Sequence, residues 1–243
     1  MKILGQIIMH YGSPYLGAVL ESIMPQVDHM VILYTDYPSQ GFMPDHPCPD
    51  TQENLIRIAD PWWDRITWVH GHWPHEGAHV DAIWDFAPGY HWVVRVDSDE
   101  IFPAGMVAAM IAQAEKTDHR HYRLPIQHFW RSFSRVCRDG QMPVRLTRVM
   151  GLGGEQYLDA EGGKWAIAHM GYAQPTKYIQ YKLQVSGHRP EFRLDWFEDR
   201  WLANAQEDLH PVCYDFWKTE DYDKTKLPKA LLHHPFYNLE IIE

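Results

Sequence analysis

Short apolar runs alternate, over the first hundred residues, with segments whose apolar residues recur at helical spacing. Runs rich in β-branched and aromatic residues predict strands at 3–9, 29–36, 65–73 and 91–96. The intervening segments predict helices within 10–27, 51–64 and 76–87. Strands and helices that alternate in this order form a parallel sheet with helices on its faces. The continuous apolar character of 91–96 further predicts a central strand with parallel neighbours from 3–9 and 29–35.

Three acidic residues follow the strand predicted at 91–96, namely Asp97, Asp99 and Glu100. Ligands of open α/β sheets bind outside the carboxyl ends of the strands, so these side chains are expected to project where a substrate lies. Paired carboxylates are also the hard oxygen ligands that Mg²⁺ and Mn²⁺ select. Acidic residues at strand ends also form caps and turns, so the triplet alone leaves both interpretations open.

The second half of the chain has a different pattern. The sequence predicts a helix at 104–116, a strand at 119–130 and a hairpin over 131–150 that turns at Asp139 and Gly140. Beyond residue 175 it predicts helices at 175–188 and 191–205. We therefore expect a sheet domain over 1–175 and a C-terminal helical extension over 176–243 that packs on it.

Charge and cysteine content narrow the classes of function. The net charge of −10 argues against a nucleic-acid binder, which needs a cationic surface. The three Cys are far apart, which indicates neither a disulfide framework nor a zinc site and favours a reducing cytoplasm. The N-terminal apolar run is too short for a transmembrane helix and lacks a cleavage site. The 11 Trp and 13 Tyr suit a carbohydrate ligand, although core packing explains most single rings.

An ordered set of motifs resembles the GT-A glycosyltransferases of the family 2 type. It consists of "LESIMPQVDHMVILYTD", "VDSDE" as the DxD motif, "PVRLTRV", "GGEQYLDAEGG" and "IAHMGYAQPTKYIQYK", and it covers roughly residues 1–185. The resemblance implies a Rossmann-like, mostly parallel sheet and transfer of a sugar from a nucleoside-diphosphate sugar to a hydroxyl acceptor. It implies Mn²⁺ or Mg²⁺ as cofactor. His10 and Tyr11 replace the family's Asn-Glu, and "TDYPSQG" replaces its second loop, so the base, uracil or guanine, stays open.

The resemblance also implies roles for individual residues. Asp97 and Asp99 would lie at the diphosphate and metal, with Asp99 the direct ligand, and His169 would complete the metal site. A lone His on an apolar strand can equally be a core residue. Asp36 resembles the acid that contacts the nucleoside. Arg145 belongs to the one basic stretch, which would attract a diphosphate, although an exposed Arg on an edge hairpin needs no ligand.

Inversion at the anomeric carbon would need a general base opposite the departing diphosphate. Glu155, set among glycines after the strand "PVRLTRV", is the predicted base, with Asp159 and Glu161 as the other candidates. Fold does not fix function. A sugar or nucleotide binding module on a decayed scaffold, or a metal-dependent phosphohydrolase that uses the same carboxylates, would carry the same motifs.

Overall fold

A computed structural model describes residues 1–243 except 40, 138–141, 159–164 and 213–216. The strands are β1 (Ile3–Met9), β2 (His29–Tyr34), β3 (Ile66–His70), β4 (Trp92–Val96), β5 (Glu100–Ile101), β6 (His121–Arg123), β7 (Ile126–Trp130), β8 (Arg135–Cys137), β9 (Val144–Arg148), β10 (Glu155–Tyr157), β11 (Ile167–Tyr172) and β12 (Thr219–Asp221). The α-helices are α1 (Ser13–Ile23), α2 (Gln52–Ala59), α3 (Glu76–Asp81), α4 (Met106–Ala114) and α5 (Thr176–Val185). The short helices are η1 (Met24–Gln26), η2 (Asp60–Arg65), η3 (Ala82–Asp85), η4 (Arg189–Glu191), η6 (Lys224–Lys226) and η7 (Lys229–Leu231), with η5 (Phe197–Leu202) a π-helix.

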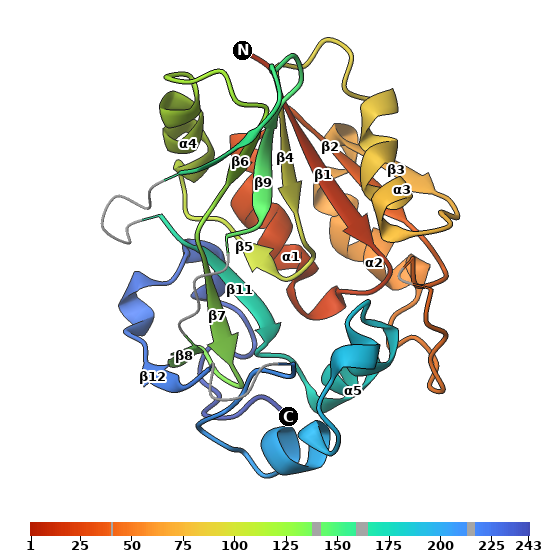
Figure 1. Ribbon diagram of the computed structural model, residues 1–243, viewed down its shortest axis with the longest axis vertical. Coiled ribbons are helices and arrows are strands. Elements are labelled where there is room, and N and C mark those ends of the chain that lie inside the picture. The colour runs from red at the N-terminus through yellow and green to blue at the C-terminus, as the bar shows by residue number, and fades with distance from the viewer. Residues whose placement is uncertain (40, 138–141, 159–164, 213–216) are drawn as a thin grey trace.

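The larger sheet has the order β10-β6-β9-β4-β1-β2-β3, and its strands β3, β2, β1 and β4 are parallel (Figure 1). Alternate residues of these strands enter separate cores. Ile7 and Val94 pack in one core with residues of α1, α2 and α4. Leu4 and Val93 pack in another with Ile83 of η3. Burial of both faces explains the unbroken apolar runs, and the predicted α/β class, a mostly parallel sheet flanked by helices, is confirmed.

The neighbours of β4 differ from the prediction. One is β1, as expected and parallel, but the other is β9, which is antiparallel. The strand β2 lies beyond β1, so the prediction that residues 29–35 flank the central strand was wrong. Hydrophobicity requires that β4 be covered on both faces, but it does not specify which strands supply its edge hydrogen bonds.

A second sheet of order β12-β8-β7-β11-β5 lies below the first in Figure 1. The strand predicted at 119–130 is two strands, β6 in the larger sheet and β7 in the second, because Pro125 separates them and has no N–H to donate. The predicted hairpin over 131–150 was also wrong, since β8 and β9 belong to different sheets. Its turn at 139–140 lies outside the described residues.

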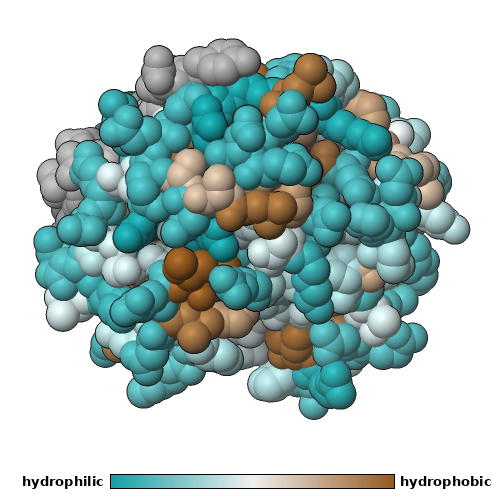
Figure 2. Space-filling model, turned by 90° about the horizontal axis from the view of Figure 1, so that it is seen from below, coloured by the Kyte–Doolittle hydropathy of each residue, from teal (hydrophilic) through white to brown (hydrophobic). Residues whose placement is uncertain are grey.

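The C-terminal segment begins with α5, as predicted, but the described part of 191–205 contains only the short η5 and part of η4. A third core gathers Trp130, Trp196, Trp201 and Trp217, which are all buried. The end of the molecule that holds α5 has a mainly hydrophilic surface with separate hydrophobic groups (Figure 2). These four tryptophans therefore fill a core instead of forming a sugar-binding face. The division of the chain at residue 175 stays a prediction.

None of the helices in the described part of the chain has the length and hydrophobicity needed to cross a membrane.

Candidate functional site

A cavity of about 260 Å³ opens at the carboxyl ends of β1 and β4. From β1 the chain passes to β2 and β3 on one side, whereas β4 lies on the other side of β1. Such a reversal is a topological switch point, where open α/β sheets bind ligands. The cavity lining includes Met9, His10, Tyr11, Gly12, Pro38, Ser39, Glu76, Arg95, Asp97, Ser98, Asp99, His169, Gln174 and Lys182.

The turn after β1 lies directly against the turn that follows β4, residues 97–100, which we call the acidic turn. Gly12 has a φ of 152°, and a Cβ there would lie 2.3 Å from Ser98 Oγ. Only a glycine leaves room for the Ser98 side chain at this position. The Asp50 carboxylate accepts hydrogen bonds from the N–H groups of Gly12 and Ser13 at 2.8 and 2.9 Å, which fixes the start of α1. The two turns, which both line the cavity, are thus in direct contact.

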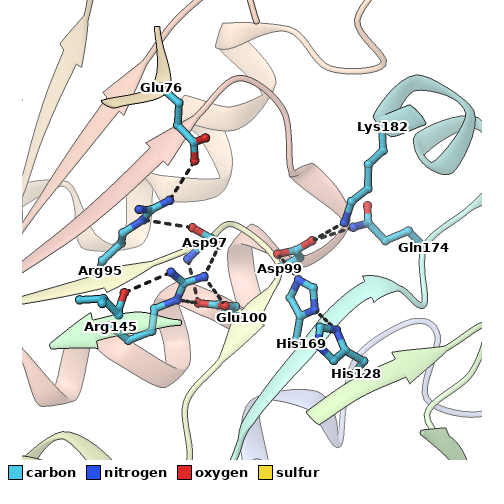
Figure 3. Close-up of polar contacts among 11 residues, drawn as sticks. Glu76, Arg95, Asp97, Asp99, Glu100, His128, Arg145, His169, Gln174 and Lys182 are labelled. Carbon is cyan, nitrogen blue, oxygen red and sulfur yellow. Dashed lines mark hydrogen bonds and ion pairs between the residues drawn. The ribbon is translucent and has the colours of Figure 1, made fainter. Parts of the chain in front are cut away.

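Pairing of β5 with β11 brings His169 to Asp99. His169 lies opposite Glu100 in this antiparallel pair, and Met170 N donates to the Asp99 carbonyl at 2.8 Å. His169 Nε2 is consequently 3.5 Å from Asp99 Oδ1 (Figure 3). Asp99 and His169, two of the three residues predicted for the metal, do lie together although they are far apart in sequence.

Arg145 engages two of the three acids. Its Nε and Nη2 donate to the two carboxylate oxygens of Glu100 at 2.7 Å each, and Nη2 also donates to Asp97 (Figure 3). Glu100 is fully buried, so the expectation that it projects toward a substrate was wrong. The predicted binding of a diphosphate by Arg145 also finds no support, because its side chain is 7% exposed and its guanidinium is already shared by these carboxylates. Arg145 holds the acidic turn in place.

Burial and charge set the pKa values of these acids in opposite ways. Burial raises the pKa of Glu100 to about 7, against the opposing effect of Arg145. Burial also raises the pKa of Asp97, but Arg145 and Arg95 together outweigh it, so that this pKa falls below its ordinary value. Asp97 therefore stays ionised, with its carboxylate engaged by arginines.

Asp99 is the acid that faces the cavity with few strong partners. Its Oδ2 accepts a hydrogen bond from Gln174 Nε2 at 3.1 Å and lies 3.9 Å from Lys182 Nζ. Burial raises the pKa of Asp99, while the charge of Lys182 opposes this shift. Asp99 is thus placed to take a further cationic partner.

His169 is held as a neutral imidazole. Burial, followed by the neighbouring His128, lowers its pKa well below the ordinary value, and the Nδ1 atoms of the two rings share a hydrogen bond of 2.7 Å. A neutral imidazole nitrogen is a common metal ligand.

Asp99 and His169 could hold a divalent cation together. Two ligands bound at roughly 2.1 Å from one ion are roughly 3.0 to 3.5 Å apart, which the 3.5 Å between Asp99 and His169 matches. Among the described residues, no group of three or more His, Cys, Asp or Glu forms a metal site. Two protein ligands fit an ion whose other positions are filled by substrate and water.

Glu155 lies away from the cavity. It belongs to β10 at the edge of the larger sheet, separated from β4 by β6 and β9. At the usual spacing of strands this places it about 14 Å from β4. Its carboxylate pairs with Arg123 Nε at 2.7 Å, so Glu155 is not positioned to act as the predicted base. Asp159 and Glu161 lie outside the described residues.

Asp36 follows β2, as predicted, but is not among the residues that line the cavity. Its Oδ2 lies 2.6 Å from His70 Nε2 at the end of β3, and its side chain is half exposed. Pro38 and Ser39 of the following loop do reach the cavity wall. A contact of Asp36 with a nucleoside stays a prediction.

Three cavity residues, Arg95, Gln174 and Lys182, were missed from the sequence. Arg95 interrupts the apolar run of β4. A charged residue within a buried strand is rarely buried without a partner, so the sequence does indicate that Arg95 has one. Gln174 and Lys182 carry no comparable signal, because only the tertiary structure brings α5 and the segment between β11 and α5 to Asp99.

No protein-family model and no curated protein matches the sequence. Among solved structures, 4-diphosphocytidyl-2C-methyl-D-erythritol synthase from Anaerococcus prevotii matches at 16% identity and a TM-score of 0.36, over 60% of this chain and 63% of that one. S. aureus TarS matches at 13% identity and a TM-score of 0.41, over 61% of this chain and 47% of that one. A third match is glucosyl-3-phosphoglycerate synthase from Mycobacterium tuberculosis, solved with Mn²⁺, UDP and phosphoglyceric acid. Its identity is 18% and its TM-score 0.35, over 54% of this chain and 43% of that one. The matches span less than two thirds of these structures, and with TM-scores this low they assign no activity to the chain.

Proposed function

We propose that this protein transfers a sugar from a nucleoside-diphosphate sugar to a hydroxyl acceptor. The observation that carries the proposal is the arrangement of Asp99, His169 and Lys182 in a cavity at the switch point of the sheet. Departure of a diphosphate builds negative charge, which a transferase must neutralise in a site shielded from water. The cavity combines the groups that this chemistry needs.

A divalent cation, Mn²⁺ or Mg²⁺, is the proposed cofactor, with Asp99 and His169 as its protein ligands. When bound, it would supply positive charge to the departing diphosphate. The chain's own residues orient the ligands. Gln174 Nε2 donates to Asp99 Oδ2 and fixes that carboxylate, while His128 shares a hydrogen bond with His169 and fixes the ring. Asp97, whose Oδ2 accepts from Arg145, is the proposed acceptor of a hydrogen bond from the nucleotide.

Inversion at the anomeric carbon stays part of the proposal, with Asp159 as its candidate base. Glu155 is set aside because of its ion pair with Arg123 and its distance from β4. The configuration of the product, determined by NMR, tests this point directly. A product with retained configuration would refute inversion and remove the need for a separate base.

The central test is cleavage of UDP- and GDP-sugars with and without Mn²⁺, measured as release of the nucleoside diphosphate. Asp99→Asn is expected to lower the rate by about 100- to 1000-fold, the usual effect of losing one charge-stabilising group. Asp64→Asn, at an exposed acid of η2, is the matched control and should behave as wild type.

Other outcomes of this test identify the alternatives. Release of the intact donor by every variant would indicate a binding module. Cleavage of simple phosphate esters without any acceptor would indicate a phosphohydrolase. Equal rates for Asp99→Asn and wild type would show that the reaction, if present, does not use this cavity.

A further inference from the structure

We propose that Lys182 is a phosphate-binding residue of this site, which holds the donor's diphosphate by direct contact. The inference rests on the proposed function and gives a role to a residue that ends the motif "IAHMGYAQPTKYIQYK" but to which the resemblance assigned none. Lys182 lies on α5, and its side chain extends to Asp99, where Nζ is 3.9 Å from Oδ2 (Figure 3). Among the described residues that line the cavity, Lys182 is the one lysine.

The ammonium group of Lys182 rests in a cradle built by β11. The Gly171 carbonyl accepts a hydrogen bond from Nζ at 3.2 Å, and the Tyr172 ring faces Nζ at 4.8 Å. A Cβ at Gly171 would lie 2.7 Å from Nζ, so the backbone leaves room for the ammonium only because this residue is a glycine. The Gly171 carbonyl and the Tyr172 ring thus hold the charge at the cavity.

Lys182 differs from the other cations at this site because it still has N–H donors that are not bonded to a carboxylate. Arg145 is shared by Glu100 and Asp97, and Arg95 lies between Glu76 and Asp97. The carboxylate nearest to Lys182 is 3.9 Å away, which is longer than a hydrogen bond. An ammonium has three donors, and the Gly171 carbonyl accepts from one. The remaining donors can serve phosphate oxygens of a ligand.

The position of Lys182 predicts opposite effects on the metal and on the nucleotide. An ion bound by Asp99 and His169 would be repelled by an ammonium this close to the same carboxylate. A diphosphate would be attracted by both cations. Removal of the Lys182 charge should therefore strengthen binding of the metal alone and weaken binding of the nucleotide. Loss of a merely structural lysine would weaken both.

The experiment compares Lys182→Met and Lys182→Arg with Lys177→Met, a control at an exposed lysine of the same helix. Binding of Mn²⁺ alone is measured by electron paramagnetic resonance, and binding of UDP and GDP by calorimetry in Mn²⁺ buffer. Lys182→Met should weaken nucleotide binding by about 10- to 100-fold and tighten Mn²⁺ binding. Lys182→Arg should keep most of the nucleotide affinity, and Lys177→Met all of it.

Two results would overturn the inference while the proposed function stands. One is nucleotide binding by Lys182→Met equal to that of Lys177→Met. The other is a parallel loss of Mn²⁺ and nucleotide binding, which would make Lys182 a structural residue. Failure of the wild-type protein to bind either nucleoside diphosphate would instead refute the proposed function, and this inference with it.

Discussion

Replacement of Arg145 by Met is expected to destabilise the fold strongly, because it leaves the carboxylate of Glu100 buried without its cation. Glu100 is 0% exposed and accepts two hydrogen bonds of 2.7 Å from the guanidinium. Loss of one partner from a buried ion pair costs about 3 to 5 kcal/mol. In a chain of this size each kcal/mol lowers the Tm by about 2 to 4 °C, so we expect a fall of about 6 to 20 °C.

The loss should depend on pH in a defined direction. Burial already raises the pKa of Glu100 to about 7, and removal of Arg145 takes away the charge that opposes this shift. A carboxyl group with a raised pKa binds its proton more tightly in the folded than in the unfolded state, so its contribution to stability is lost as pH rises. Thermal and urea unfolding of Arg145→Met should show the larger defect at pH ~8 and partial recovery at pH ~5.5.

Arg123→Met is the matched control, because Arg123 pairs with Glu155 at the surface, where the two side chains are 32% and 45% exposed. Such pairs contribute about 0 to 1 kcal/mol. The double variant Arg145→Met with Glu100→Gln should regain part of the lost stability, since it no longer leaves the Glu100 carboxylate buried without its cation. A fall in Tm for Arg145→Met no larger than that for Arg123→Met would refute the role assigned to the buried pair.

The remaining predictions concern Glu155, His169 and Gly171. Glu155→Gln should leave donor cleavage close to wild type; a loss of about 100-fold would return it to the site as a base. Burial lowers the pKa of His169 from 6.5, so its contribution to stability is present above that pH and lost as the pH falls below it. His169→Asn should therefore reduce the dependence on pH of the free energy of urea unfolding below pH 6.5, by up to about 1.4 kcal/mol per pH unit. An unchanged dependence would contradict this. A Cβ at Gly171 would lie 2.5 Å from His169 Cε1, so Gly171→Ala should lower both Tm and Mn²⁺ affinity, whereas Gly17→Ala, with ordinary contacts, should lower neither.

Much of the fold could be predicted because burial is encoded locally. The apolar runs of β1, β2 and β4 and the helical spacing of α1 are properties of neighbouring residues, and they specify the type of each element without knowledge of its partners. The pairing of β9 with β4 could not be predicted in this way. The antiparallel partner of a strand is set by long-range packing, and the sequence of β4 is equally compatible with β2 as its neighbour.

In the acidic turn, the position of the acids is determined by the sequence and their roles by the tertiary structure. The sequence by itself determined that Asp97, Asp99 and Glu100 follow a buried strand, and that a ligand site should lie there. Only the tertiary structure decided their separate roles, since β9 brings Arg145 to Glu100 and Asp97, while β11 and α5 bring His169 and Lys182 to Asp99. The role of a carboxylate depends on its burial and on the charge opposite it, and both are set by which strands and helices pack together.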